Sequence, residues 1–126
     1  MRKEHTMEAN RMEQLEALET LCQFNDRLLA NLPTLSSELS EGRKSDTDAY
    51  LKSIIDAINW EISVMNSTSA LLAEGNTPID KESFNQAILA LGTALSSGDD
   101  SQTASALRNL IPHFKTLGSA AKEAVS

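Results

Sequence analysis

The chain has 126 residues, 40% of them hydrophobic and 23% charged, which suits one globular domain spanning residues 1–126 and argues against disorder. Eighteen acidic against eleven basic residues give a net charge of −7 at pH 7, and the basic residues are scattered. This charge pattern disfavours binding to nucleic acid or to an anionic membrane surface. Leucine and alanine make up about a quarter of the chain and valine occurs only twice, so the composition predicts an all-α protein.

The single cysteine and the lack of long apolar runs bear on the compartment. Cys22 cannot form an internal disulfide, which suits a reducing environment. Residues 1–10 contain no apolar stretch of signal-peptide length, and no run elsewhere approaches the length of a membrane span. We therefore expect a cytoplasmic protein with no membrane partner, in which residues 1–7 form a frayed N-terminal arm.

The first predicted helix ends at Gly42, where a left-handed backbone conformation carries little strain. Pro33 lies within it and is expected to cause a kink or a short break. Asn25 and Ser36 occupy polar gaps in its apolar stripe, whose residues recur every three or four positions. The stripe comprises Leu15, Leu18, Leu21, Cys22, Phe24, Leu28, Leu29, Leu32, Leu35 and Leu39.

The second predicted helix begins at a capping-box pair, Ser45 and Asp48, and ends at Gly75. We take Ile58 as the centre of its apolar stripe. The stripe also repeats at steps of three and four residues, and it comprises Leu51, Ile55, Ile58, Ile62, Met65, Ser69 and Leu72.

Two more helices complete the prediction. Thr77 as N-cap and Pro78 at the first helical position mark the start of the third helix, which Gly98 ends. The fourth helix begins at the capping-box residue Asp99, and Pro112 is expected to bend it.

The short connections between these helices favour antiparallel neighbours, so we predict an up-down antiparallel four-helix bundle. Its two hairpins are residues 8–74 and 77–125. Their sequences match at an offset of about 56 residues, with identical residues at Leu39/Leu95, Ser40/Ser96, Gly42/Gly98, Ser45/Ser101, Thr47/Thr103, Leu51/Leu107 and Ile55/Ile111. Two interpretations stay open: a duplicated helical hairpin, or the shared pattern of any two leucine-rich hairpins.

Residues 50–60, which follow the Glu41-Gly42 stop, and the Leu110-Ile111-Pro112 step carry a resemblance to a known group. They resemble small, largely uncharacterised, all-helical proteins of Gram-positive bacteria, some of which carry a molecular-chaperone label. The resemblance covers roughly residues 15–118 and departs from the group at Ala57, where a glycine is expected. It implies a helical fold and supplies no catalytic or ligand-binding residue.

Residues that could carry catalysis or bind a metal are few and poorly spaced. Metal sites in helical bundles use Glu-x-x-His pairs on facing helices, but neither His5 nor His113 has a glutamate three residues before it. Cys22 lies on the apolar stripe among leucines, as a small core residue does. We therefore predict that the protein is not an enzyme and needs no metal or cofactor.

His113 supports one alternative function. Histidine phosphotransfer domains are acidic four-helix bundles of this size, and residues 113–120 are superficially similar to their motif. A phosphorylated histidine needs a lysine one helical turn further on and a small residue beside it. Here Lys115 is only two positions on, about 200° around the helix, and the fourth position is Leu117. A phosphotransfer-like signalling bundle that uses His113 is the alternative hypothesis.

Trp60, the only tryptophan, indicates a second apolar strip on the solvent side of the second predicted helix. With Ile58 at the centre of the core stripe and about 100° per residue, Trp60 lies about 160° away. Val64 and Leu71 fall within roughly 40° of Trp60, and Ala57 lies at the edge of the same strip. Either the first helix or the N-terminal arm covers this apolar strip, or it binds a partner.

We favour the second interpretation. The sequence thus predicts a non-catalytic protein–protein interaction module, meaning an adaptor, a small chaperone or a regulatory subunit that presents helix faces to a protein partner. Self-association as a twofold dimer through Trp60 is a further expectation.

Overall fold

The computed structural model describes the backbone of residues 2–126 and the side chains of residues 10–126. Five helices follow one another: α1 (Arg2–Glu41), α2 (Thr47–Ser67), α3 (Ser69–Ala73), α4 (Lys81–Ser97) and α5 (Asp100–Val125). Helix accounts for 86% of the chain and the described residues contain no strand, so the all-α prediction is confirmed. Residues 1–7, expected to form an arm, lie outside the part of the chain whose side chains are described.

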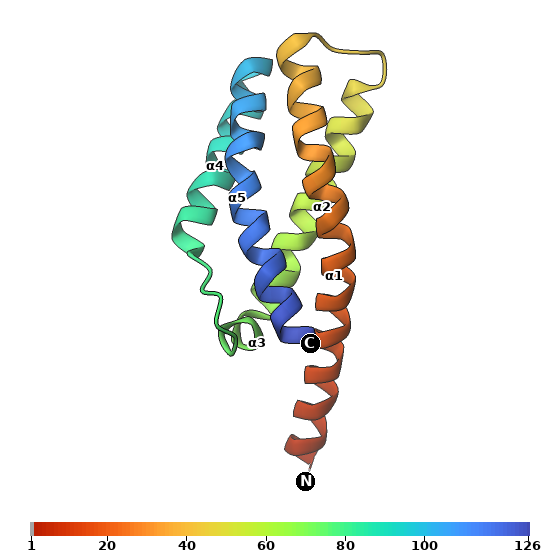
Figure 1. Ribbon diagram of the computed structural model, residues 1–126, viewed down its shortest axis with the longest axis vertical. Helices are drawn as coiled ribbons and strands as arrows, with labels where there is room; N and C mark the ends of the chain where they lie inside the picture. Colours follow the sequence, from red (N-terminus) through yellow and green to blue (C-terminus); the bar gives the residue numbers. More distant parts are fainter. Residues whose placement is uncertain (1) are drawn as a thin grey trace.

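The helices α1 and α5 form the centre of the fold. α1 packs against both α2 and α5, while α5 packs against α1, α4 and α3. In Figure 1, α1 runs upward, α2 returns, α4 runs upward again, and α5 returns to the lower end beside α1. The core lies between them, and its largest fully buried side chains are Leu18, Leu21, Leu32, Leu35, Ile58, Met65, Phe84, Leu107, Leu110, Phe114 and Leu117, together with Glu61.

The two glycine stops are where the sequence places them. α1 ends at Glu41 and α4 ends at Ser97, and the glycine after each helix, Gly42 or Gly98, has a positive φ. A residue with a side chain would be strained in this left-handed conformation. The ends of α1 and α4 are therefore set by the glycine that follows each helix, and both glycines can be read from the sequence.

Two of the predicted helix starts are wrong. α2 begins at Thr47, and its N-cap Asp46 makes no capping bond, so Ser45 and Asp48 do not form a capping box. α4 begins at Lys81 rather than Pro78, because the Asp80 side chain accepts the Ser83 N–H and caps the helix there. A local cap thus sets the start of α4. At the start of α2, the Thr47 hydroxyl accepts the Lys44 N–H and donates to Glu38 of α1.

Both helices continue through their internal prolines. α1 has no break at Pro33, so that alternative is wrong, and α5 is continuous through Pro112; a kink at Pro33 and a bend at Pro112 stay predictions. Both rings lie on exposed faces, where water can bond the carbonyl that loses its helical partner. The second helix, by contrast, ends at Ser67 instead of Gly75, because Thr68 leaves the helical conformation and the short α3 follows.

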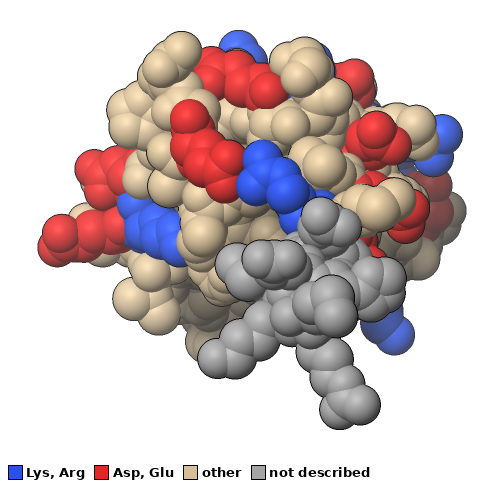
Figure 2. All heavy atoms as spheres, turned by 90° about the horizontal axis from the view of Figure 1, so that it is seen from below, with Lys and Arg blue, Asp and Glu red and all other residues tan. Residues whose placement is uncertain are grey.

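Ion pairs tie the ends of the helices together. Seen from below, acidic side chains are spread over the described surface, and basic ones lie singly or beside them (Figure 2). The Arg11 guanidinium forms two bonds of 3.0 Å to Glu74, just after α3. These groups are exposed, so each pair adds little to stability.

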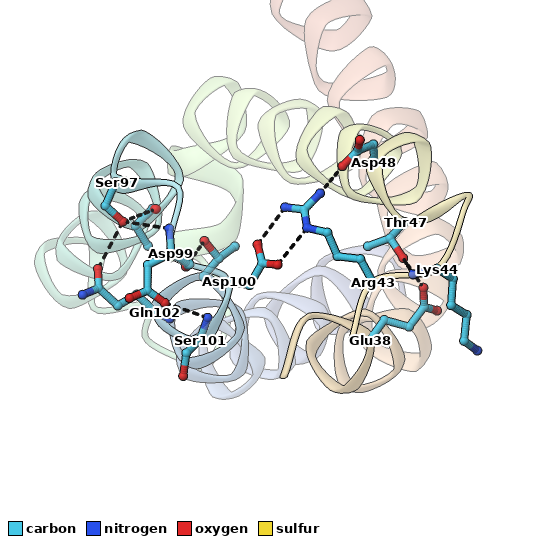
Figure 3. A network of polar contacts seen from close by, with 12 residues as sticks. Glu38, Arg43, Lys44, Thr47, Asp48, Ser97, Asp99, Asp100, Ser101 and Gln102 are labelled. Atoms are coloured by element: carbon cyan, nitrogen blue, oxygen red, sulfur yellow. Dashed lines mark hydrogen bonds and ion pairs between the residues drawn. The ribbon is translucent and has the colours of Figure 1, made fainter. Parts of the chain in front are cut away.

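At the other end of the molecule, Arg43 in the loop between α1 and α2 joins both hairpins (Figure 3). It donates to both carboxylate oxygens of Asp100, at 2.8 and 2.7 Å, and also to Asp48. The bond to Arg43 holds the pKa of Asp100 below its ordinary value. Asp99 caps α5 by accepting the N–H groups of Ser101 and Gln102, which confirms the predicted start of that helix.

Gly118 sets how closely α1 approaches α5. The Asn25 side-chain nitrogen donates a hydrogen bond of 3.0 Å to the Phe114 carbonyl. A Cβ on Gly118 would lie 2.4 Å from that nitrogen. We therefore expect Gly118→Ala to lower the free energy of unfolding by about 1–3 kcal/mol, despite the better helix propensity of alanine.

The matched control for this substitution is Gly92→Ala in α4, where a Cβ meets nothing within 4 Å. It should raise the free energy of unfolding by about 0.5–1 kcal/mol, and urea denaturation measures both variants. If the two variants change stability equally, the close approach at Gly118 does not limit the packing.

Candidate functional site

An exposed aromatic pair joins α1 to α2. The rings of Phe24 on α1 and Trp60 on α2 lie 5.2 Å apart between centroids and are tilted by 53°. Phe24 is 45% exposed and Trp60 is 38% exposed, so each ring packs on the other and still faces solvent. The Arg27 guanidinium lies 5.9 Å from the centre of the Phe24 ring, within cation–π range.

The predicted strip around Trp60 is not a continuous outer surface. Val64 and Leu71 belong to the hydrophobic core, and Ala57 is half-buried against it, so their predicted place on the solvent side of the helix is wrong. Trp60 alone of the four is exposed. Phe24, predicted as a core residue of the first helix, lies at the surface and is the second member of the exposed pair.

The reason is a rotation of α2 relative to the predicted stripe. Ile54, Ile58, Val64 and Met65 are buried on this helix, whereas Leu51, Ile55 and Ile62 are only half-buried. The middle of the buried face is Glu61. Because Glu61 is a charged residue type, the sequence pattern places the centre of the apolar face toward Ile55 and Ile62. In the structure the buried face is shifted toward Val64.

Glu61 is the residue that sequence analysis missed. Its side chain is fully buried, and neither carboxyl oxygen has a hydrogen-bond partner within the described structure. Burial raises the pKa of Glu61 to about 8, so the carboxyl is mainly neutral at pH 7. The available signal was its spacing, three residues after Ile58 and three before Val64, on the face that the apolar residues share.

Asn25 extends this buried polar region onto α1. Its side-chain nitrogen donates to the Phe114 carbonyl, but its side-chain oxygen has no partner in the described part of the chain. Asn25 follows Phe24 in the chain as Glu61 follows Trp60. Each helix therefore carries an exposed aromatic ring next to a buried polar side chain in the sequence. Buried polar groups without a partner are rare in native proteins.

Cys22 behaves as a packed thiol. It is half-buried and packs against the core, and burial raises its pKa above the ordinary value. A raised pKa leaves less of the reactive thiolate near neutral pH. Its surroundings therefore favour a structural role.

His113 lies at a surface cavity of about 300 Å³ beside the N-terminus of α4. Its ring packs on Phe84, with 5.3 Å between centroids, and Asp80 lines the same cavity. Lys115 is exposed, and Leu117 is buried in the core. An adjacent cavity of similar volume lies under the loop between α3 and α4, where Lys81 donates to Ser69 at 2.7 Å.

Among the described residues, no three or more His, Cys, Asp or Glu side chains are grouped so that they could hold a metal ion. Within the same residues, none of the helices has the length and apolar character needed to cross a membrane.

The comparisons with known proteins give one family. The family model described as "Domain of unknown function (DUF8042)" matches residues 16–119, which is most of the chain and includes the aromatic pair and Glu61. No curated protein and no solved structure matches the chain.

The unpaired carboxyl of Glu61 should cost stability. We expect Glu61→Met, which fills similar space with an apolar group, to raise the free energy of unfolding at pH 7 by about 1–3 kcal/mol. Asp56→Met, at an exposed acid of the same helix, is the control and should change it by less than about 0.5 kcal/mol. Urea denaturation measures the free energy of unfolding of both variants. A lower value for Glu61→Met than for the wild type would mean that the carboxyl has a partner.

Proposed function

Since the chain belongs to the DUF8042 family, whose description names no activity, we propose from its surface that it is a non-catalytic protein–protein interaction module. In this proposal it works as an adaptor, a small chaperone or a regulatory subunit in the cytoplasm. The docking surface is the α1–α2 face that carries Phe24 and Trp60.

The observation that carries the proposal is the exposed aromatic pair. Two large rings packed on each other leave an apolar surface in water that a partner can cover. Tryptophan and arginine are enriched at interface hot spots, and Arg27 lies beside Phe24. At about 25 cal/mol per Å², covering both rings contributes a few kcal/mol before the entropy of association is subtracted.

Charge supports a protein partner over a nucleic acid. The net charge is −7, and the end of the molecule in Figure 2 shows no gathering of basic side chains among its described residues. A phosphate backbone needs such a patch.

The same proposal takes the architecture as an up-down four-helix bundle of two duplicated hairpins, with α3 as an added turn. The alternating course of α1, α2, α4 and α5 in Figure 1 supports it. The matched ends of α1 and α4, each directly before a glycine with positive φ, support the duplication.

A second copy of the chain is the simplest partner to test. We expect the wild-type protein to sediment as a dimer at tens of micromolar, and Trp60→Glu to shift it toward monomer without loss of helicity, because a charge replaces the ring at the contact. The measurement is sedimentation velocity together with circular dichroism.

Leu89→Glu is the matched control, since Leu89 is 70% exposed on α4 and outside the proposed surface. It should leave sedimentation unchanged. A monomeric wild type would remove self-association from the proposal, and loss of helicity in Trp60→Glu would place Trp60 among the residues that hold the fold.

The alternative function, phosphotransfer through His113, is favoured by one observation: the imidazole lines a surface cavity. The nearby Asp80 counts against it, because a carboxylate beside the ring repels phosphate. If the alternative holds, incubation with a phosphodonor and a partner kinase should give acid-labile phosphate that His113→Gln loses. Absence of label on the wild-type protein would remove this function.

A further inference from the structure

The carboxyl of Glu61 lies at the contact between α2 and the rest of the fold. It is 0% exposed, and both of its oxygens lack hydrogen-bond partners among the described residues. A neutral carboxyl at such a place costs the desolvation of one polar group, whereas an ionised one costs far more. The packed position of α2 therefore favours the protonated form of the Glu61 carboxyl.

The polar bonds that hold α2 lie at one end of it. Thr47 donates to Glu38 at 2.9 Å, and the Tyr50 hydroxyl donates to Asn31 at 2.6 Å. Beyond Tyr50, no side chain of α2 bonds to α1, α4 or α5 among the described residues. α2 ends at Ser67, and Ile58, Val64 and Met65 are the buried apolar residues of the half that contains Glu61.

We propose that Glu61 is a proton-operated latch: α2 stays packed on α1 while the carboxyl is protonated, and loss of that proton to solvent releases residues 58–67. The N-terminal end of α2 stays attached to α1 through Thr47 and Tyr50. The released segment bends at its two ends, after Tyr50 and at Thr68. The device goes beyond the proposed function and stands whether or not a partner docks on the aromatic pair.

Other titratable groups near Glu61 are few. On α1, the Cys22 thiol is near enough for the charge of Glu61 to raise its pKa. The exposed Glu19 and Asp26 raise the pKa of the same thiol. On α5, Lys122 lies 3.6 Å from Asp26 and also influences Cys22. α3 has no titratable side chain. Burial raises the pKa of the Cys22 thiol above its ordinary value.

The direction of the pH effect follows from the two states. Released and solvated, Glu61 has a pKa near the ordinary 4.5, while packed it has a pKa of about 8. Below about pH 4.5 both states hold the proton and the packed state keeps its full stability. Between these values only the packed state holds it, so release becomes up to about tenfold more favourable per pH unit. Above about pH 8 the effect levels off.

Hydrogen exchange of the full-length protein, read by mass spectrometry between pH 5 and 9, tests the latch. After correction for the intrinsic pH dependence of exchange, the protection of residues 58–67 should fall by up to about tenfold per pH unit from pH 5.5 to 7.5 and then level off. Protection in α5 should stay constant. Trp60 fluorescence should follow the same curve, since Trp60 lies in the released segment and its ring packs on Phe24 of α1.

Glu61→Gln keeps the shape of the side chain and cannot ionise, so its protection should not change with pH; Glu61→Met gives the same readout if the glutamine variant folds poorly. Asp56→Asn, at an exposed acid of α2, and Cys22→Ala should both keep the wild-type curve. The latch is wrong if wild-type protection is flat, if Glu61→Gln keeps the slope, or if α5 loses protection together with α2.

Discussion

The close packing of α1 against α5 is the constraint on which the other helices depend. α2 packs on α1 and α4 packs on α5, so both outer helices take their positions from this central pair. Gly118 leaves the space for Asn25, whose side chain bonds the Phe114 carbonyl across the contact. The absence of a Cβ at Gly118 and the buried amide of Asn25 thus set the distance between α1 and α5.

Stability is distributed unevenly around this centre. α4 and α5 share an apolar contact in which Phe84 meets Phe114 edge to face, with 5.1 Å between ring centroids. The contact of α2 instead contains the unpaired carboxyl of Glu61. Exposed ion pairs such as Arg11–Glu74 fasten the ends and add little energy. The α1–α2 contact therefore includes a buried polar group whose desolvation costs free energy.

The exposed pair and the buried polar groups occupy the same seam on its two sides. Phe24 and Trp60 face solvent, and the residues that follow them, Asn25 and Glu61, face inward. In the proposed latch, a movement of α2 that exposes Glu61 also separates the two rings. The proposed docking surface would then respond to the proton on Glu61.

The sequence by itself determined the all-α class, the ends of α1 and α4 at Gly42 and Gly98, and the cap at Asp99. These features depend on composition and on local backbone chemistry, which neighbouring residues report directly. Of the candidate site, it identified Trp60 as exposed but misplaced Val64 and Leu71. Only the tertiary structure decided which side of α2 faces α1, because a carboxyl that burial neutralises is indistinguishable in sequence from a solvated one. The partner ring, Phe24, was hidden for a related reason: an apolar residue at the edge of a helical stripe is buried or exposed according to how the neighbouring helix is rotated.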